Sequence, residues 1–265
     1  MINTLPSRSG QTLEAQNLMT DSSIIQGFPP QCLEPPVTPL AWQRDRWKGW
    51  HLFGAASFLV SVPVFVEAPL VRSYPWISLA IAPFWAILSW GLEHRNPTNR
   101  WGDLLWGFTL TWLAGSLYWG WLRWEPLLHL PVEAIGLPLV VWMLRRGQWR
   151  VGGFFYLGSL LGTAITDIYF YLVDLIPYWR SVMLVDPDLG RSILQFALAS
   201  MQTPWALGWA GVLIAILLTG GLLPLVLIKS VRQGSPQSIH WWAFSGAILC
   251  TLVVDGLFWI AAGQI

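Results

Sequence analysis

The stretch Val151–Ile176, VGGFFYLGSLLGTAITDIYFYLVDLI, decides how this chain folds. It is long enough to cross the hydrocarbon core of a bilayer as an α-helix, for which about 20 apolar residues are needed. It also carries two carboxylates, Asp167 and Asp174, which are costly in hydrocarbon. The stretch therefore predicts a membrane-spanning helix with a polar face.

Other stretches of similar length are also apolar, and they extend over most of the remaining chain: His51–Val71, Tyr74–Leu92, Trp101–Leu122, Leu127–Leu144, Trp205–Ile228 and His240–Ala262. Helices are expected because the backbone must satisfy its own hydrogen bonds in lipid, and a barrel would show short alternating segments. We predict an all-α polytopic transmembrane helix bundle of about seven spans. Pro83 in the second span, and Pro131 and Pro138 in the fourth, leave a tilted or re-entrant segment as an alternative there.

The composition agrees with this prediction. Hydrophobic residues make up 54% of the chain and charged residues 11%, where soluble domains have roughly 25% charged residues. The chain has 20 tryptophans, a residue that gathers where a bilayer meets water. Most of them flank the predicted spans and form an interfacial belt. Five lie deeper, where each indole N–H needs a partner: Trp85, Trp106, Trp112, Trp142 and Trp259.

The basic residues predict the orientation of the bundle. With the N-terminus inside, four of the 15 lie in outer segments, Arg72, Arg123, Arg180 and Arg191, and the other eleven lie in cytoplasmic segments. Lys and Arg are retained on the cytoplasmic side. We therefore predict a cytoplasmic N-terminus and a C-terminus on the outer or lumenal side.

Two parts of the chain fall outside the predicted spans. Residues 1–46 are polar and rich in proline, and we expect a disordered tail before the transmembrane domain of residues 47–265. The longest loop lies on the outer side, and residues 189–202 within it have one apolar helical face. That pattern predicts an interfacial helix, with a short helix that caps the bundle as the alternative.

Carboxylates inside the spans are the candidate functional residues. On this topology they all lie in the outer half of the membrane: Glu67, Glu133, Asp167, Asp174 and Asp255. Helical spacing adds Thr163, Tyr171 and Tyr178 to the face that bears Asp167 and Asp174. Such a polar stripe, facing the bundle interior, would bind a proton or a cation. The structural alternative is that the acids reach the interface or bond to neighbouring hydroxyls.

Other features of the sequence narrow the function. Small residues at helical spacing, such as Gly158 with Gly162 and Gly107 with Gly115, indicate close helix packing. The four histidines lie near span ends, so no pair is placed to hold a haem, and we found no hydrolase, nucleotide-binding or metalloprotease motif. We therefore predict that the protein is not an enzyme. A chlorophyll at His129, walled by tryptophans, is an alternative to simple packing. Any cofactor or metal stays unknown.

A weak inverted similarity links the first and fourth spans. Pro63, Glu67 and Pro69 of the first resemble Pro131, Glu133 and Pro138 of the fourth, with the acid at a different offset in each, and the two predicted spans run in opposite directions. Repeats of this kind, with broken helices at the substrate site, are found in transporters.

The stretch WKGWHLFGAA, which begins at Trp47, and the stretch VSVPVFVEAPLVR, which ends at Arg72, resemble a family of uncharacterised cyanobacterial membrane proteins. The resemblance extends from about Trp47 to the C-terminus. It implies a plasma (inner) or thylakoid membrane of a photosynthetic bacterium, and it implies no activity.

Two functions follow as hypotheses. The first is a small transporter or permease whose outer-half acids form a proton or cation site. The second is a non-catalytic accessory or assembly factor of a photosynthetic membrane complex. The expected partners are the lipid bilayer and, for the second hypothesis, other complex subunits. The net charge of +1 gives no reason to expect a nucleic-acid partner.

Overall fold

The computed structural model describes residues 39–96, 99–185, 187–230 and 238–262. All regular structure in these residues is helical. In chain order the elements are α2 Pro39–Val62, η2 Pro63–Glu67, α3 Ala68–Ser73, α4 Pro75–Arg95, α5 Arg100–Leu117, η3 Tyr118–Leu122, η4 Pro126–Leu128, α6 His129–Glu133, η5 Ala134–Gly136, α7 Leu137–Arg145, α8 Arg150–Leu172, α9 Ile176–Leu184, α10 Pro187–Met201, α11 Pro204–Ser230 and α12 His240–Ala262. The predicted all-α class is confirmed.

Six helical segments of the described chain are long and apolar enough to cross a membrane: Lys48–Ser73, Pro75–Arg95, Pro126–Arg145, Arg150–Leu172, Pro204–Leu227 and His240–Ile260. They correspond to six of the seven predicted spans. The remaining one is α5 with its continuation η3. This helix is more polar, since Arg100 and Asp103 lie in its first turn and small polar residues follow.

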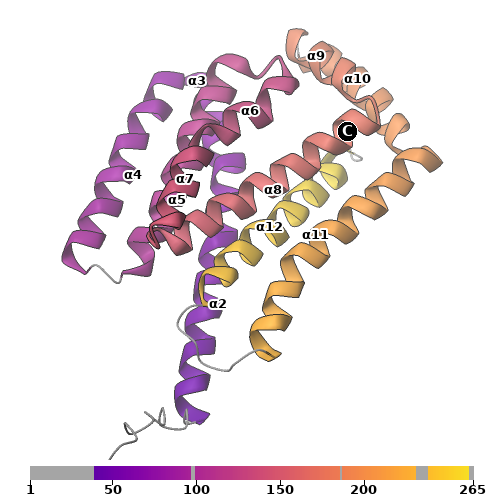
Figure 1. Cartoon of the computed structure of the whole chain (residues 1–265). Coiled ribbons are helices and arrows are strands. Elements are labelled where there is room, and N and C mark those ends of the chain that lie inside the picture. Colours follow the sequence, from indigo (N-terminus) through magenta and orange to yellow (C-terminus); the bar gives the residue numbers. More distant parts are fainter. Residues whose placement is uncertain (1–38, 97–98, 186, 231–237, 263–265) are drawn as a thin grey trace, which may run out of the picture. The chain divides into compact units, whose positions relative to one another are not determined.

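The α5 helix lies in the core rather than at the surface. Its residues Leu104, Phe108 and Trp112 are each at most 2% exposed. It packs against α4 on one side and against α8 on the other, and α12 packs against both α8 and α2 (Figure 1). Because α5 is covered by neighbouring helices, it does not need the apolar surface of a lipid-facing helix.

The surfaces of the outlying helices are strongly apolar. On α4, Phe84 and Ile87 are 58% and 67% exposed, and α11 exposes Leu207, Val212 and several further aliphatic residues. Exposed apolar side chains of this kind suit a lipid environment better than water. The surface of these helices is therefore compatible with a membrane, as their lengths are.

The α5–α8 contact is the closest approach between the helices of the core. Gly107 of α5 and Gly152 of α8 face each other, and a Cβ atom on either would overlap backbone atoms of the opposite helix. Gly158 packs in a similar way against the backbone of Phe244 in α12. The small-residue spacing predicted close packing at these glycines, and this prediction is confirmed.

Asp103 joins the same two helices by hydrogen bonds. Its two carboxylate oxygens accept from the backbone N–H groups of Val151 and Gly152, each at 2.9 Å. These are first-turn N–H groups of α8, which have no partner within their own helix. The side chain thus caps α8 from a neighbouring helix, where its negative charge also meets the positive end of the helix dipole.

We expect Asp103→Ala to destabilise the fold by about 2 to 3 kcal/mol, because two buried N–H groups lose a charged acceptor. Thermal unfolding of the purified protein in mild detergent would measure this loss. Glu93→Gln is the control, since Glu93 accepts a single side-chain hydrogen bond of 3.0 Å, from the Trp106 indole, near the same end of the bundle. Equal unfolding temperatures for the two variants would contradict the capping role.

Several predicted boundaries differ in the structure. The first helix begins at Pro39, within the segment predicted as tail, because proline is tolerated in the first turn of a helix. Residues 1–38 of that tail lie outside the described residues. A helix is present as α10 where an interfacial helix was predicted, and α9, which was predicted as loop, is also helical. Pro177, read there as a loop residue, stands in the first turn of α9.

Candidate functional site

The fourth predicted span is a broken helix. Its segments are η4, α6, η5 and α7, with Pro131 inside α6 and Pro138 in the first turn of α7. The short 3-10 segment η5 separates α6 from α7 directly after Glu133. The prolines thus coincide with a change of helix type. In a membrane, backbone of this kind is tolerated where it is buried in protein or lines a water-filled cavity.

Two π-helical segments lie next to the break. The first, η2, ends at Glu67, and the second, η3, begins at Tyr118. Pro63 and Glu67, which the sequence matched with Pro131 and Glu133, therefore also lie in irregular backbone. Single π-helical turns occur often at functional sites. Together with η5, the two π-helical segments give three departures from α-helix. Glu67 ends one of them and Glu133 directly precedes another.

His129, at the start of α6, is the centre of the first polar cluster. Its Nδ1 atom lies 3.0 Å from Oδ1 of Asp167 in α8, and its Nε2 atom lies 3.9 Å from Oε1 of Glu133, one turn along α6. The ring of Tyr118 packs 4.3 Å from the imidazole ring. The second oxygen of Asp167 is buried without a hydrogen-bond partner. We call His129, Glu133 and Asp167 the histidine cluster.

Asp255 of α12 lies beside this cluster. Its Oδ2 atom accepts a hydrogen bond of 2.8 Å from Thr166, the residue before Asp167. Tyr156 donates a hydrogen bond of 2.5 Å to the backbone carbonyl of Glu133. Four helical elements, α5 with η3, α6, α8 and α12, therefore contribute polar groups to one part of the interior.

Glu67 forms a second cluster that is completely buried. One carboxylate oxygen accepts a hydrogen bond of 2.7 Å from Ser116, whose hydroxyl lies 2.8 Å from that of Ser78. The other oxygen has no partner and packs against Gly115, where a Cβ atom would lie 2.8 Å from it. Ser116 and Tyr118 are two residues apart, so one short segment contacts both clusters.

In the described chain, none of the four carboxylates Glu67, Glu133, Asp167 and Asp255 has an ion pair with Lys or Arg. The basic side chain nearest to them in the contacts above is His129. A charge at such a depth costs several kcal/mol unless it is paired, hydrated or neutralised by a proton. Within the same residues, no group of three His, Cys, Asp or Glu side chains is arranged to hold a metal ion.

The predicted polar stripe is wrong in its outer part. The α8 helix ends at Leu172, and Asp174 adopts a left-handed backbone with φ of 56°, which turns the chain out of the helix. Asp174 is therefore exposed in the loop, and Tyr171 is 64% exposed on the outer face of the last turn. Tyr178 belongs to α9, where it bonds Ser200. The other two residues of the predicted stripe, Thr163 and Asp167, are half-buried on α8.

The sequence placed His129 near a span end and tested it only as a pigment ligand. The structure instead directs both ring nitrogens toward carboxylates. Among the tryptophans that would pack around a chlorophyll at His129, Trp119 has its ring 6.3 Å from the imidazole ring. Trp106 instead donates a hydrogen bond to Glu93, and Trp112 donates one to the carbonyl of Ser78. The His–x–x–x–Glu spacing at 129–133, one helical turn, is the signal that could have found this pair.

The deep tryptophans were predicted to need polar partners. The prediction is confirmed for Trp106 and Trp112, which donate to a carboxylate and to a carbonyl. It is wrong for Trp142 and Trp259, which are about half exposed at 48% and 53% and so face the surface. The indole nitrogen of Trp85 is buried and has no partner.

An ion pair lies just beyond the histidine cluster. Arg180 of α9 binds Glu125, the residue before η4, through two nitrogens at 2.8 to 3.1 Å. Both side chains are partly exposed. The hydrogen bonds from Arg180 hold the pKa of the Glu125 carboxyl below its usual range, so this carboxyl is ionised at neutral pH.

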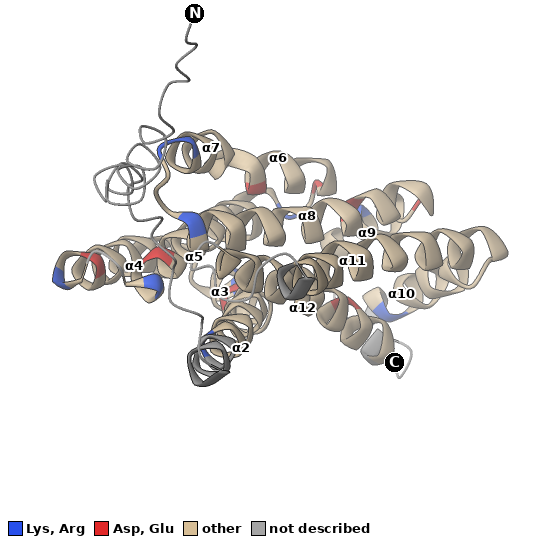
Figure 2. Cartoon of the chain, turned by 60° about the horizontal axis from the view of Figure 1, so that its bottom comes forward, with Lys and Arg blue, Asp and Glu red and all other residues tan. Residues whose placement is uncertain are grey.

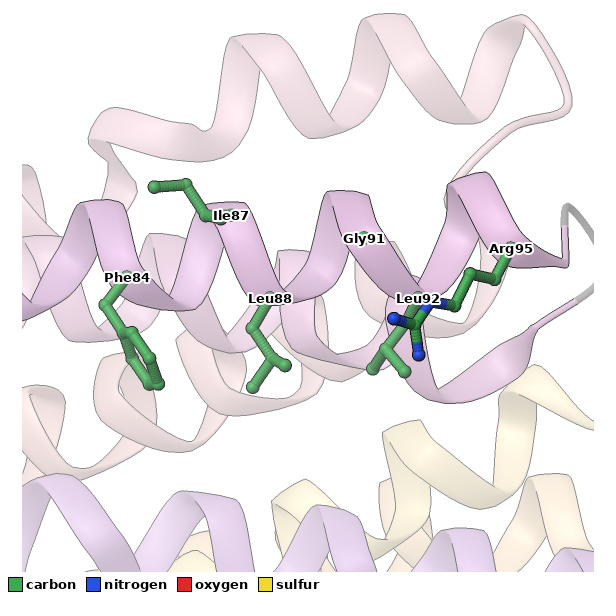
Figure 3. Close-up of a pocket in the computed structure, with 6 residues that line it drawn as sticks. All are labelled: Phe84, Ile87, Leu88, Gly91, Leu92 and Arg95. Carbon is green, nitrogen blue, oxygen red and sulfur yellow. The ribbon is translucent and has the colours of Figure 1, made fainter.

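A surface groove on α4 lies apart from these clusters. It is lined by Phe84, Ile87, Leu88, Gly91, Leu92 and Arg95, and it has a volume of about 280 Å³ (Figure 3). Its lining is apolar except for Arg95 at one end. It contains none of the acids described above, so we place the candidate site at the buried clusters and not at this groove.

Several arginines stand at the end of the bundle that also holds Glu93 and Asp103. Arg95, Arg145 and Arg150 stand where α4 and α7 end and where α8 begins, and the ends of α4 and α7 are marked by basic residues in Figure 2. The carboxylates of the site lie toward the opposite ends of their helices. Between the two, Leu104, Phe108 and Phe155 form a fully buried apolar layer.

Comparisons with known proteins give one result. A family model described as "Protein of unknown function (DUF3120)" matches residues 56–263. Neither a curated protein nor a solved structure matches the chain significantly. The matched range covers both polar clusters, the broken helix and the α9–α10 segment.

Proposed function

Because the chain belongs to the DUF3120 family, whose description gives no activity, we propose from its geometry that it is a small permease that moves protons, or a cation in exchange for protons. The single observation that carries the proposal is the histidine cluster. A histidine that lies 3.0 Å from one carboxylate, with a second carboxylate one turn away, can take up a proton and pass it on.

The irregular backbone supports the same proposal. Transporter sites are commonly built at broken helices near a repeat interface. In this chain the break after Glu133 and the π-turn at Glu67 both carry an acid, and the two lie in the segments that the sequence matched as an inverted pair. We infer that these segments form the two sides of the permeation site.

We further propose seven spans, with α5 as the buried one, and the basic ends of the helices on the cytoplasmic side. In that orientation the carboxylates lie in the outer half of the bilayer. The apolar layer of Leu104, Phe108 and Phe155 separates them from the inner side. The conformation described here is thus closed toward the cytoplasm. The resemblance noted in the sequence implies the plasma or thylakoid membrane of a photosynthetic bacterium.

Proton uptake into liposomes tests the proposal. We expect the purified protein, with a potassium diffusion potential across the vesicle, to carry protons that a trapped pH dye reports. Asp167→Asn removes the partner of His129 and should lower this flux roughly tenfold or more, as loss of a proton-transfer group does. Asp174→Asn is the matched control, since Asp174 is exposed in the loop after the same helix and asparagine also adopts its left-handed backbone conformation.

Two results would contradict the proposal. One is a wild-type flux no larger than that of protein-free liposomes, and the other is an equal flux for Asp167→Asn and Asp174→Asn. A colourless or pigmented protein that moves no protons but co-purifies with subunits of a larger complex would favour the accessory or assembly role instead.

A further inference from the structure

We propose that α9 is an outer gate over the histidine cluster, held closed by the ion pair of Glu125 with Arg180. This inference rests on the proposed function and adds to it the route by which the site meets the outer solution. The α9 helix follows directly after α8, which carries Asp167, and it contacts the η4 segment directly before His129 (Figure 1). It is thus joined to both sides of the cluster.

The aromatic contacts connect α9 to the cluster, whose His129 and Asp167 side chains are each 22% exposed. The ring of Trp179 lies 5.9 Å from that of Trp119, and the Trp119 ring lies 6.3 Å from His129. The Trp179 indole also donates a hydrogen bond of 2.7 Å to the carbonyl of Arg123. One residue of α9 therefore contacts the η3 helix that packs on the histidine and the turn that follows it.

The latch stands beside this aromatic contact. Arg180 is the neighbour of Trp179, and it binds both oxygens of Glu125. Glu125 in turn caps η4 by accepting from the N–H of Leu127 at 3.2 Å. Exposed ion pairs are individually weak. A weak latch suits a gate, since it closes the site without preventing it from opening.

A hinge lies at the other end of α9. Asp174 adopts a left-handed conformation between α8 and α9, which non-glycine residues rarely populate. It is held by local contacts, among them the bond of the Leu175 N–H to the carbonyl of Phe170 at 2.9 Å. A change of backbone angles at Asp174 would move α9 away from η3 and η4 and separate the ring of Trp179 from that of Trp119. That motion opens a path to His129.

Chemical modification of His129 tests the gate independently of transport. The full-length protein in mild detergent is treated with diethylpyrocarbonate, and the rate at each histidine is measured by mass spectrometry of peptides. Glu125→Gln and Arg180→Gln should each raise the rate at His129 by up to about fivefold, the population change that an exposed ion pair supports. The rate at His240 should not change.

Two further variants make the test specific. The charge-reversed pair Glu125→Arg with Arg180→Glu should restore the slow rate, because it rebuilds the ion pair with opposite polarity. Arg191→Gln, which removes an arginine from α10 on the same side of the bundle, is the matched control and should leave the rate unchanged.

The outcomes separate the gate from the proposed function. Unchanged His129 rates in both single variants, or a fast rate in the reversed pair, would overturn the gate even if proton flux depends on Asp167. A rate that responds as expected in a protein that moves no protons would support α9 as a movable cover and overturn the proposed function.

Discussion

Replacement of Gly152 by valine is expected to prevent the accumulation of folded protein. A Cβ atom at this position would overlap the backbone of Asp103, and it would lie 2.9 Å from the backbone nitrogen of Gly107. Neither neighbour is a flexible side chain, so α5 and α8 would have to separate. The separation would also break the hydrogen bonds from Val151 and Gly152 to Asp103.

The expected cost is large relative to the stability of a folded protein. Forcing extra atoms into a packed core costs typically about 1 to 3 kcal/mol, and loss of the cap adds about 2 to 3 kcal/mol. Net stabilities are only about 5 to 15 kcal/mol. The yield of monodisperse protein in size-exclusion chromatography of a fluorescent fusion measures the outcome.

Gly91→Val is the matched control for this prediction. Gly91 lies on α4, and a Cβ atom there meets no other atom within 4 Å. The same substitution in a similar apolar helix should therefore leave the yield close to wild type. Comparable yields for Gly152→Val and Gly91→Val would show that the α5–α8 contact is looser than described.

The second large effect is expected from Asp167→Asn combined with Asp255→Asn. The two carboxylates are linked through Thr166, the residue before Asp167 in α8. Its hydroxyl donates a hydrogen bond of 2.8 Å to Asp255. If both belong to one proton path, the double variant should lower liposome proton flux about as far as Asp167→Asn alone, a loss of roughly tenfold or more. Asparagine keeps the shape of the side chain, so the unfolding temperature should change little.

The single variants show how the two residues act. Groups in one path have non-additive effects, so Asp255→Asn should add little once Asp167 is neutral. Independent contributions that multiply would indicate two separate roles. A double variant with the flux of wild type would remove both residues from the permeation site.

The positions of the long helices could be predicted because lipid would impose a simple rule on sequence. Every predicted apolar stretch of about 20 residues became a helix or a series of short helices. Pro131 and Pro138 also indicated the break in the fourth predicted span. These are local properties that a single stretch of residues reveals.

The pairing of side chains could not be predicted in the same way. The sequence correctly placed His129 near the end of a predicted span. That position does not reveal that His129 contacts Asp167, because Asp167 lies on another helix. The stripe from Thr163 to Tyr178 assumed that α8 continues, and the left-handed turn at Asp174 ends it. An aspartate at position 174 does not by itself predict this turn, because aspartate adopts the left-handed conformation only occasionally.

The apolar layer formed by Leu104, Phe108 and Phe155 has an electrical consequence. A transmembrane voltage falls mainly across the part of a protein that excludes water and charge. A unit charge that crosses the full field gains or loses about 2.3 kcal/mol per 100 mV. The carboxylates of the candidate site lie on one side of this layer. In the proposed permease, a proton exchanged between them and the outer solution would cross little of the field, and its passage inward would cross most of it and so respond to the membrane potential.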